Sequence, residues 1–249
     1  MIAIPAIDLR DGACVQLVGG EYDAERVRLD DPVAVARDWA RAGFRQLHVV
    51  DLDAATGRGS NAAVIEELLR DATLPIQVGG GVRSAERVEA LLEMGAARVV
   101  VGTRALEDPD WLADLARDFP GVLVVAADVR GRKVTTRGWA RTLRRDIVDT
   151  VAELAELPLA AVMVTAVHRE GQMQGPDYFL IDDIMDVTRD ATMHATVGTS
   201  RLPVYASGGI AGMHDLRELA ERGVAAAILG MALYTGALDP RLVTEEFAG

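Results

Sequence analysis

Short apolar segments alternate with longer segments of helical spacing along the whole chain. The apolar segments are rich in β-branched residues and almost continuously hydrophobic, which is typical of parallel strands covered on both faces. They cover residues 2–7, 47–50, 75–78, 98–101, 122–127, 161–164, 203–206 and 226–229. Apolar positions recur with a helical period in residues 32–42, 62–70, 84–94, 110–118, 146–157 and 213–222. The pattern therefore predicts strands and helices in regular alternation.

One stretch departs from this alternation. A further helix is predicted to begin near Tyr178 and to end by about Arg189. The polar residues 190–200 that follow it predict an insertion or an exposed loop before the next strand.

Eight strand–helix units in 249 residues predict an α/β fold, a single (β/α)8 TIM barrel. An open, doubly wound sheet is the structural alternative. No linker or change in composition divides the chain, so residues 1–249 are predicted to form one domain.

The chain also repeats itself by halves. Residues 75–81 (PIQVGGG) resemble residues 203–209 (PVYASGG), and residues 99–102 resemble residues 227–230 at the same spacing. The simplest interpretation is a barrel built from two similar half-barrels.

The repeated glycine-rich turns are candidates for phosphate binding. Glycine at the end of a strand lets the backbone approach a phosphate group and point N–H groups at it. The first predicted cradle consists of Gly79, Gly80, Gly81, Gly102 and Thr103, and the second of Ser207, Gly208, Gly209 and Gly230. Either set alone could form an ordinary tight turn, but two sets at matched positions favour a small-molecule substrate with two phosphate groups.

Asp8 and Asp128 end the first and fifth predicted strands and so occupy matching places in the two halves. Active sites of such barrels lie at this end of the strands, and two carboxyl groups there can divide the roles of acid and base. Each could instead be a turn or helix-capping residue. Asp51 and Asp53, after the second strand, are predicted to order their loop.

Two polar loops are expected to lie near this site. The segment after the sixth strand is rich in glycine and predicts a mobile loop, with Thr165 and Gly171 as candidate contacts and Glu170 as a further candidate acid. After the fifth strand, Arg137 and Trp139 offer a cation and an aromatic ring suited to stacking on a planar heterocycle. Either segment could also be an ordinary exposed loop.

Charge and composition limit the class of partner. The formal net charge of −12 argues against a nucleic-acid or anionic-membrane partner, which would need a basic surface. No apolar run approaches the roughly 18 residues of a membrane helix, and the N-terminal residues lack the features of a signal peptide. We therefore expect a cytoplasmic monomer.

Cysteine and histidine usage bears on cofactors. Cys14 is the only cysteine, and the histidines are scattered, with His48 expected to pack within or beside the second strand. These residues predict no disulfide and no metal site.

Several motifs together resemble a known family, the ProFAR (phosphoribosylformimino-aminoimidazole carboxamide ribotide) isomerases of histidine biosynthesis. They are IPAIDLRDG at 4–12, HVVDLD at 48–53, QVGGGVR at 77–83, TRGW at 136–139 and ASGG at 206–209, with the similarity continuing to GMALY at 230–234. The resemblance implies an Amadori rearrangement of an aminoaldose phosphate to an aminoketose, without a metal or organic cofactor. It also implies that Asp8 accepts a proton, that Asp128 donates one, and that the loop after the sixth strand carries a functional acid.

The chain departs from the family pattern at three positions. The loop acid is Glu170 where the family has aspartate, Ala166 replaces an aspartate, and Gln16 stands where many members have arginine. The extra methylene of glutamate moves a carboxylate by about 1 Å, which matters if its position is critical.

Three alternatives remain at this point. Residues 51–61 also resemble dual-substrate actinobacterial relatives that isomerise phosphoribosylanthranilate, although Gly79 stands where those relatives usually have serine. The sister cyclase barrel has a lysine soon after the first strand, whereas the first lysine here is Lys133. The third alternative is a phosphate-binding barrel that has lost catalysis.

Overall fold

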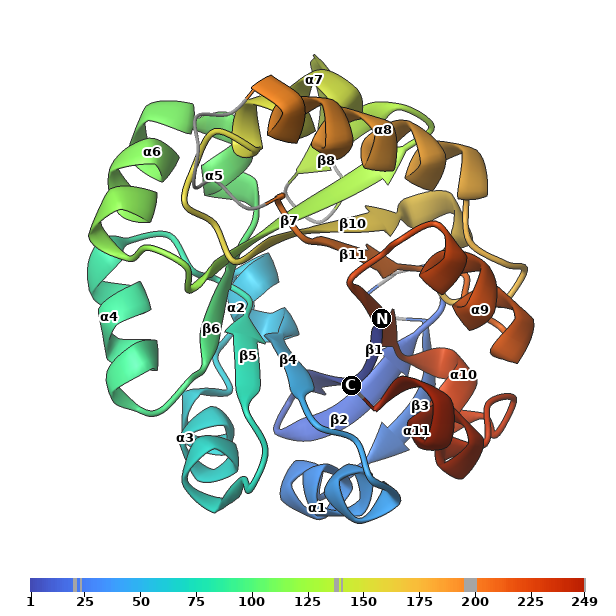
Figure 1. The fold of residues 1–249 in the computed structure, drawn as a ribbon. Helices are drawn as coiled ribbons and strands as arrows, with labels where there is room; N and C mark the ends of the chain where they lie inside the picture. Colours follow the sequence, from blue (N-terminus) through green and yellow to red (C-terminus); the bar gives the residue numbers. More distant parts are fainter. Residues whose placement is uncertain (20–21, 23, 137–138, 140, 195–200, 249) are drawn as a thin grey trace.

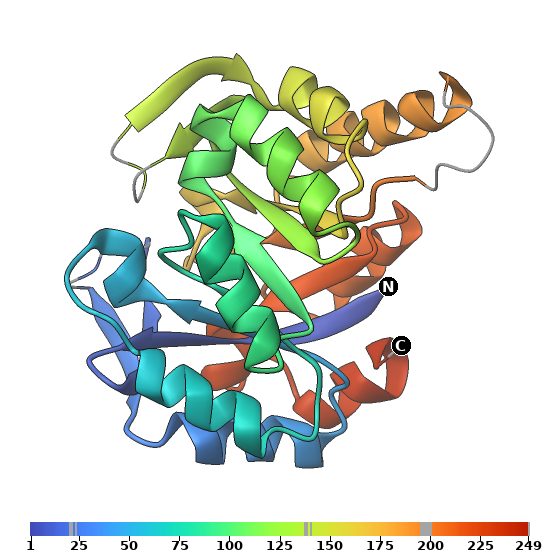
Figure 2. The ribbon, with the colours of Figure 1, turned by 90° about the vertical axis from the view of Figure 1, so that its left-hand side faces the viewer.

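The structure is a computed structural model that describes residues 1–19, 22, 24–136, 139, 141–194 and 201–248. In this part of the chain, eight parallel strands form a closed barrel surrounded by helices (Figures 1 and 2). The barrel strands are β1 (Ile2–Arg10), β4 (Leu47–Asp51), β5 (Ile76–Gly79), β6 (Arg98–Val101), β7 (Leu123–Arg130), β10 (Ala161–Ala166), β11 (Val204–Ser207) and β12 (Ala226–Leu229). The strands pair in chain order, β12 pairs with β1, and β7 pairs with β10 to complete the ring. The predicted (β/α)8 TIM barrel is confirmed.

The helices lie outside the barrel (Figure 1). They are α1 (Pro32–Ala42), α2 (Leu52–Thr56), α3 (Ala62–Asp71), α4 (Ala85–Glu93), α5 (Thr103–Glu107), α6 (Pro109–Asp118), α7 (Ile147–Leu154), α8 (Tyr178–His194), α9 (Met213–Glu221), α10 (Met231–Tyr234) and α11 (Pro240–Phe247), with the short 3-10 helix η1 (Val167–Arg169). Three of them, α1, α6 and α11, begin where the sequence places aspartate before proline, and Asp239 caps α11 by accepting a hydrogen bond from the backbone of Arg241. The Asp31 carboxylate accepts a hydrogen bond from the backbone of Ala34, and Asp108 accepts one from Trp111, so each caps its helix.

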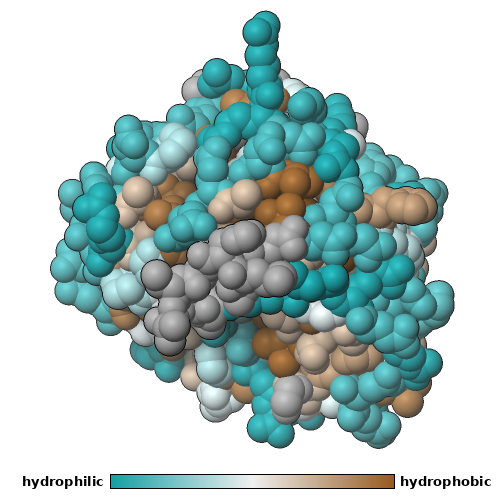
Figure 3. Space-filling model, turned by 45° about the horizontal axis from the view of Figure 1, so that its top comes forward, coloured by the Kyte–Doolittle hydropathy of each residue, from teal (hydrophilic) through white to brown (hydrophobic). Residues whose placement is uncertain are grey.

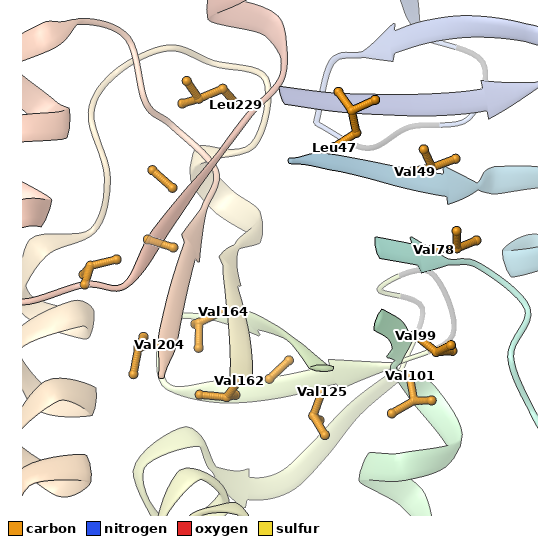
Figure 4. Close-up of a cluster of buried hydrophobic side chains, with 14 of the residues drawn as sticks. Leu47, Val49, Val78, Val99, Val101, Val125, Val162, Val164, Val204 and Leu229 are labelled. Atoms are coloured by element: carbon orange, nitrogen blue, oxygen red, sulfur yellow. The ribbon is translucent and has the colours of Figure 1, made fainter. Parts of the chain in front are cut away.

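Alternation along each strand divides the apolar residues between two cores. In β6, Val99 and Val101 face the helices while Val100 faces the barrel axis, and in β10 Val162 and Val164 face outward. Figure 4 shows the outer set between strands and helices. Because both faces are buried, these strands are almost continuously apolar.

The same alternation positions polar residues. In β1, Ile4 and Ala6 belong to the inner core, so Asp8 also faces the barrel axis. In β7, Val124 is an inner residue, and Asp128 has the same phase. The two aspartates therefore point toward the same central space.

Two predictions about strand ends were wrong. Asp8 and Asp128 do not end their strands, because β1 continues to Arg10 and β7 to Arg130. Each strand then turns back into an antiparallel extension, formed by β2 (Ala13–Leu17) with β3 (Glu25–Leu29) and by β8 (Lys133–Thr136) with β9 (Arg141–Asp146).

The two extensions are equivalent. Asp8 pairs with Val15 on β2, and Asp128 pairs with Thr135 on β8, seven positions further along in both cases. The turn of the first extension is Asp11-Gly12, with φ angles of 48° and 77°, which a two-residue hairpin turn with two left-handed residues requires. The two half-barrels thus share their loop architecture as well as their strands.

The end of α8 also differs from the prediction. The helix continues through His194 instead of ending by about Arg189, since residues 190–194 contain no glycine or proline to stop it. The rest of the polar segment, residues 195–200, lies outside the described residues.

The face of the molecule drawn in Figure 3 is largely polar. Hydrophilic side chains dominate the face seen in Figure 3, where hydrophobic areas are small and separate. Among the described residues, no helix combines the length and apolar character needed to cross a membrane.

Candidate active site

A pocket of about 330 Å³ opens at the carboxyl ends of the barrel strands, the usual position of active sites in this fold. Every candidate site residue in the described part of the chain lines it. These are Asp8, Asp128, Glu170, Gly79, Gly80, Gly81, Gly102, Thr103, Trp139, Thr165, Gly171, Ser207, Gly208, Gly209 and Gly230. Arg137 lies outside the described residues.

Glycine is required in the turns of both cradles. Gly80 has φ +97°, and a Cβ there would lie 2.3 Å from the carbonyl oxygen of Asp51. Gly209 has φ +84°, and a Cβ there would lie 2.5 Å from the carbonyl oxygen of Gly175. Both turns therefore have a backbone conformation and a close approach that only glycine permits.

The glycines that precede α5 and α10 occupy matching positions in the two halves of the barrel. Gly102 and Gly230 have similar backbone angles, with φ −126° and −108° and ψ −105° and −108°, immediately before α5 and α10. Each cradle thus combines two neighbouring turns at the barrel mouth, in the arrangement that a phosphate group bound by backbone N–H groups needs.

The two aspartates have different surroundings despite equivalent positions. Asp8 is partly buried, and loss of solvation raises its pKa to about 7. Burial also raises the pKa of Asp128, but hydrogen bonds from Trp139 and Thr165 favour its charged form and oppose the shift. The Trp139 indole Nε1 donates to Asp128 Oδ2 over 2.8 Å.

Glu170 adds a third carboxyl group to the pocket. It follows η1, and its Oε2 atom is buried without a hydrogen-bond partner. Burial, together with the negative charges of Asp8 and Asp128, raises its pKa to about 7. Three carboxyl groups in one pocket cannot all ionise easily, which is the setting in which protons are shared and transferred.

Glu170 and Gly171 lie against the first extension. The Glu170 carbonyl oxygen accepts a hydrogen bond from Gly19 N over 3.3 Å. Gly171 has φ +66°, and a Cβ there would lie 2.8 Å from the carbonyl oxygen of Leu17. The packing of Gly171 against this backbone accounts for glycine at that position.

Several pocket residues were not among the site candidates, and His48 and Gln16 are two buried polar ones. His48 lies within β4, as expected, but its side chain also lines the pocket. Its Nδ1 accepts a hydrogen bond from Gln77 Nε2 over 2.8 Å, and burial lowers its pKa to about 4, so the ring is neutral. The strand phase that places Asp8 inward could have identified His48 and Gln77 as well, because both are polar residues at inner positions.

Gln16 is the second missed residue. It is 4 % exposed, lines the pocket, and its Nε2 atom has no hydrogen-bond partner. Its Oε1 would lie only 2.4 Å from a Cβ at Gly230, so the amide reaches the second cradle.

Asp51 and Asp53 order their loop, as predicted. Asp51 Oδ2 accepts from the backbone N of Asn61 over 2.8 Å, and Asp53 Oδ2 accepts from the backbone N of Asp11 over 2.8 Å. Tyr22 also donates to Asp53 Oδ1 over 2.6 Å. Among the described residues, no group of three or more His, Cys, Asp or Glu side chains is placed to hold a metal ion.

Comparison with known proteins places this pocket in a family. Residues 2–239 match the family described as histidine biosynthesis protein. A Gemmatimonas aurantiaca protein is 58 % identical over 247 residues, 99 % of both chains, and a Myxococcus xanthus protein is 54 % identical over 250 residues, 100 % of both chains. A Synechocystis protein is 42 % identical over 240 residues, 95 % of this chain and 89 % of the relative. All three carry the name 1-(5-phosphoribosyl)-5-((5-phosphoribosylamino)methylideneamino)imidazole-4-carboxamide isomerase, the enzyme abbreviated ProFAR isomerase. The chain therefore belongs to the histidine biosynthesis protein family.

Proposed function

We propose that this chain is a ProFAR isomerase, which converts an aminoaldose carrying two phosphate groups into the corresponding aminoketose. The observation that carries this proposal is the pairing of two matched glycine cradles with two inward-facing aspartates in one pocket. The cradles would hold the two ends of the substrate, which places its sugar near the carboxyl groups between them.

The reaction needs an acid and a base. Asp128 would donate a proton to the ring oxygen of the sugar, so that the furanose opens to a Schiff base. Asp8 would then remove the proton from C2, and the protonated Schiff base would accept the electrons as an enolamine forms. Tautomerisation of the enolamine gives the ketose, and the substrate's own nitrogen serves as the electron acceptor throughout.

The pocket electrostatics suit this chemistry. A pKa of Asp8 near 7 makes it a stronger base than an ordinary carboxylate while leaving a large part of it ionised at neutral pH. Neutral His48 is available as a hydrogen-bond donor through its Nε2 atom, because Nδ1 is occupied by Gln77. Glu170 is a further acid at the rim of the second cradle, where a Cβ at Gly208 would lie 3.0 Å from its Oε2.

The histidine-pathway substrate is favoured over the dual-substrate alternative. The relatives compared above carry the name of the ProFAR enzyme alone. At Gly79, where dual-substrate relatives usually have serine, a Cβ would lie 2.9 Å from the Val100 Cβ. A serine would therefore require the neighbouring strand to shift.

We further propose that residues 1–249 act as a single-domain cytoplasmic monomer. Light scattering of the purified protein tests the oligomeric state, and a dimer mass would contradict it.

Steady-state isomerisation of purified ProFAR, with phosphoribosylanthranilate in parallel, tests the function. We expect turnover of ProFAR alone. Asp8→Asn should abolish turnover while ProFAR still binds, because an amide cannot accept the C2 proton. Asp110→Asn, the same change at an exposed position on α6, should leave the rate unchanged. Equal turnover of both substrates, or retained activity in Asp8→Asn, would contradict the proposal.

A further inference from the structure

The Trp139 side chain occupies an unexpected position. It was predicted to stack on a planar substrate ring, but its indole N–H donates to Asp128 Oδ2 over 2.8 Å. Trp139 also has φ 69°, in the left-handed region that few non-glycine residues adopt. Trp139 thus places its indole against the proposed acid in an uncommon backbone conformation.

This contact stabilises the wrong form of Asp128 for the first step. A donated N–H favours a carboxylate, whereas the acid that opens the sugar ring must carry a proton. Asp8 must be ionised to act as the base, but its surroundings favour the neutral form. No donor among the described residues bonds its carboxyl group, and burial disfavours its charge. The hydrogen bonding in this arrangement therefore favours charge on the acid and a proton on the base.

The other charged groups near Asp128 do not remove this imbalance. Asp8 on β1 and Glu170 after η1 are acidic and disfavour further negative charge. His48 on β4 is neutral. On the second extension, Lys133 lies 3.9 Å from Asp146, and Arg141 lies 3.0 Å from Glu107. Among the described residues, Thr165 on β10 and Trp139 are the side-chain donors that act on Asp128.

We propose that Trp139 is a positioning residue that couples substrate binding to the protonation of Asp128. Before substrate binds, its indole N–H favours the carboxylate form of Asp128, and Asp8 carries the larger share of the proton. When a planar substrate ring draws the indole into a stack, Asp128 loses this donor and takes up the proton that Asp8 releases. The transfer leaves the total charge of the three carboxyl groups unchanged and produces the acid and the base that the reaction needs.

This inference rests on the proposed function for its purpose, but its core can be measured without substrate. The carboxyl carbons of ¹³C-labelled aspartate report each ionisation by NMR, with Asp8→Asn and Asp128→Asn assigning the two signals. In Trp139→Phe, which keeps an aromatic ring and lacks the N–H, we expect the titration midpoint of Asp128 to rise by about one pH unit or more, as loss of a hydrogen bond to a charged group requires. The Asp8 midpoint should fall, because its neighbour then carries less negative charge.

Trp111→Phe is the matched control. Trp111 lies on α6 with its ring against the Arg104 guanidinium, and it makes no contact with Asp128. This variant should leave both midpoints unchanged. Equal Asp128 midpoints in the native protein and Trp139→Phe would overturn the proposal.

A measurement on the native protein covers the case in which Trp139→Phe does not fold. The chain has three tryptophans, so the indole ¹⁵N–¹H signal of Trp139 can be followed directly. It should titrate with the Asp128 midpoint and shift when ProFAR is added. An indole signal that does not respond to Asp128 ionisation would overturn the proposal. If the indole signal titrates with Asp128 but the protein does not turn over ProFAR, only the proposed function is overturned.

Discussion

Asn61 is the residue whose replacement should most clearly link stability to the position of Asp8. Its Nδ2 donates to Asp51 Oδ1 over 2.8 Å and to Asp53 Oδ2 over 2.9 Å, and its Oδ1 accepts from the backbone N of Gly12 over 2.8 Å. The side chain also reaches the carbonyl oxygen of Leu9, next to Asp8. One amide therefore joins two buried carboxylates to the turn that ends β1.

The magnitude follows from these contacts. Asn61→Ala removes two hydrogen bonds to charged groups, each contributing about 1.5–3 kcal/mol, and leaves both carboxylates less satisfied in a buried setting. We expect the free energy of unfolding to fall by about 3–5 kcal/mol. For a chain of this size, that corresponds to a fall in Tm of roughly 10 °C.

Asn61→Asp is a sharper variant because it preserves the shape. It places a third carboxyl group against Asp51 and Asp53, and the like charges raise the pKa of the introduced group above its unfolded value. The resulting destabilisation is present when that group is ionised and is relieved as pH falls through its raised pKa. The Tm of Asn61→Asp should therefore lie further below the Tm of the native protein at pH 8 than at pH 5.

Differential scanning calorimetry at both pH values, together with ProFAR turnover, tests this reasoning. Asp71→Asn is the control, since it breaks an exposed ion pair with Arg37 that should contribute less than about 1 kcal/mol. A fall in Tm for Asn61→Ala that is no larger than the fall for Asp71→Asn would refute the argument. Native turnover in an Asn61→Ala protein that is fully folded would refute the link to Asp8.

Three further predictions concern the pocket. In a calorimetric titration, Gly209→Ala should lower the affinity for inorganic phosphate at least tenfold, because φ +84° and a Cβ 2.5 Å from the Gly175 oxygen force the cradle to move. Gly212→Ala, where a Cβ would meet open space, should have no effect in the same titration. Gly79→Ser should reduce kcat/KM for ProFAR through the 2.9 Å approach to Val100, and Val100→Ala should restore part of it. Asp8→Asn should raise Tm at pH 8 and not at pH 4. The pKa of Asp8 is about 7 in the folded protein and 3.8 ordinarily, so its ionisation costs stability only as pH rises through this interval. An equal change in Tm at both pH values would contradict the raised pKa.

The barrel was predictable from sequence because its strands are buried on both faces. Residues 98–101 and 226–229 were predicted as strands and coincide with β6 and β12. The antiparallel extensions were not predicted because strands such as β3 and β9 are largely exposed and rich in arginine, without an apolar face to give a signal. The Asp11-Gly12 turn was the one clear indication of the first extension.

The site was predictable where only one residue type fits. Gly80 and Gly209 could be identified because their backbone conformation admits only glycine, and the repeat doubled that signal. Gln16 was not identified as a pocket residue because its inward direction depends on β2, which was itself missed. The contact between Trp139 and Asp128 depends on a left-handed tryptophan, which no sequence pattern indicates.

The difference between the two aspartates originates in the side chains around them and not in the backbone of the barrel. Asp8 and Asp128 share strand phase, position and the register of the extension that follows, so the backbone alone would make them alike. The second half adds Trp139 and the Thr165 hydroxyl as donors, whereas the position paired with Asp8 on the neighbouring barrel strand is Val50. Acid–base chemistry needs two carboxyl groups of unequal proton affinity. A symmetric barrel therefore becomes suited to this chemistry when its two halves place different side chains around their carboxyl groups, and a donor that can be withdrawn makes that inequality responsive to the substrate.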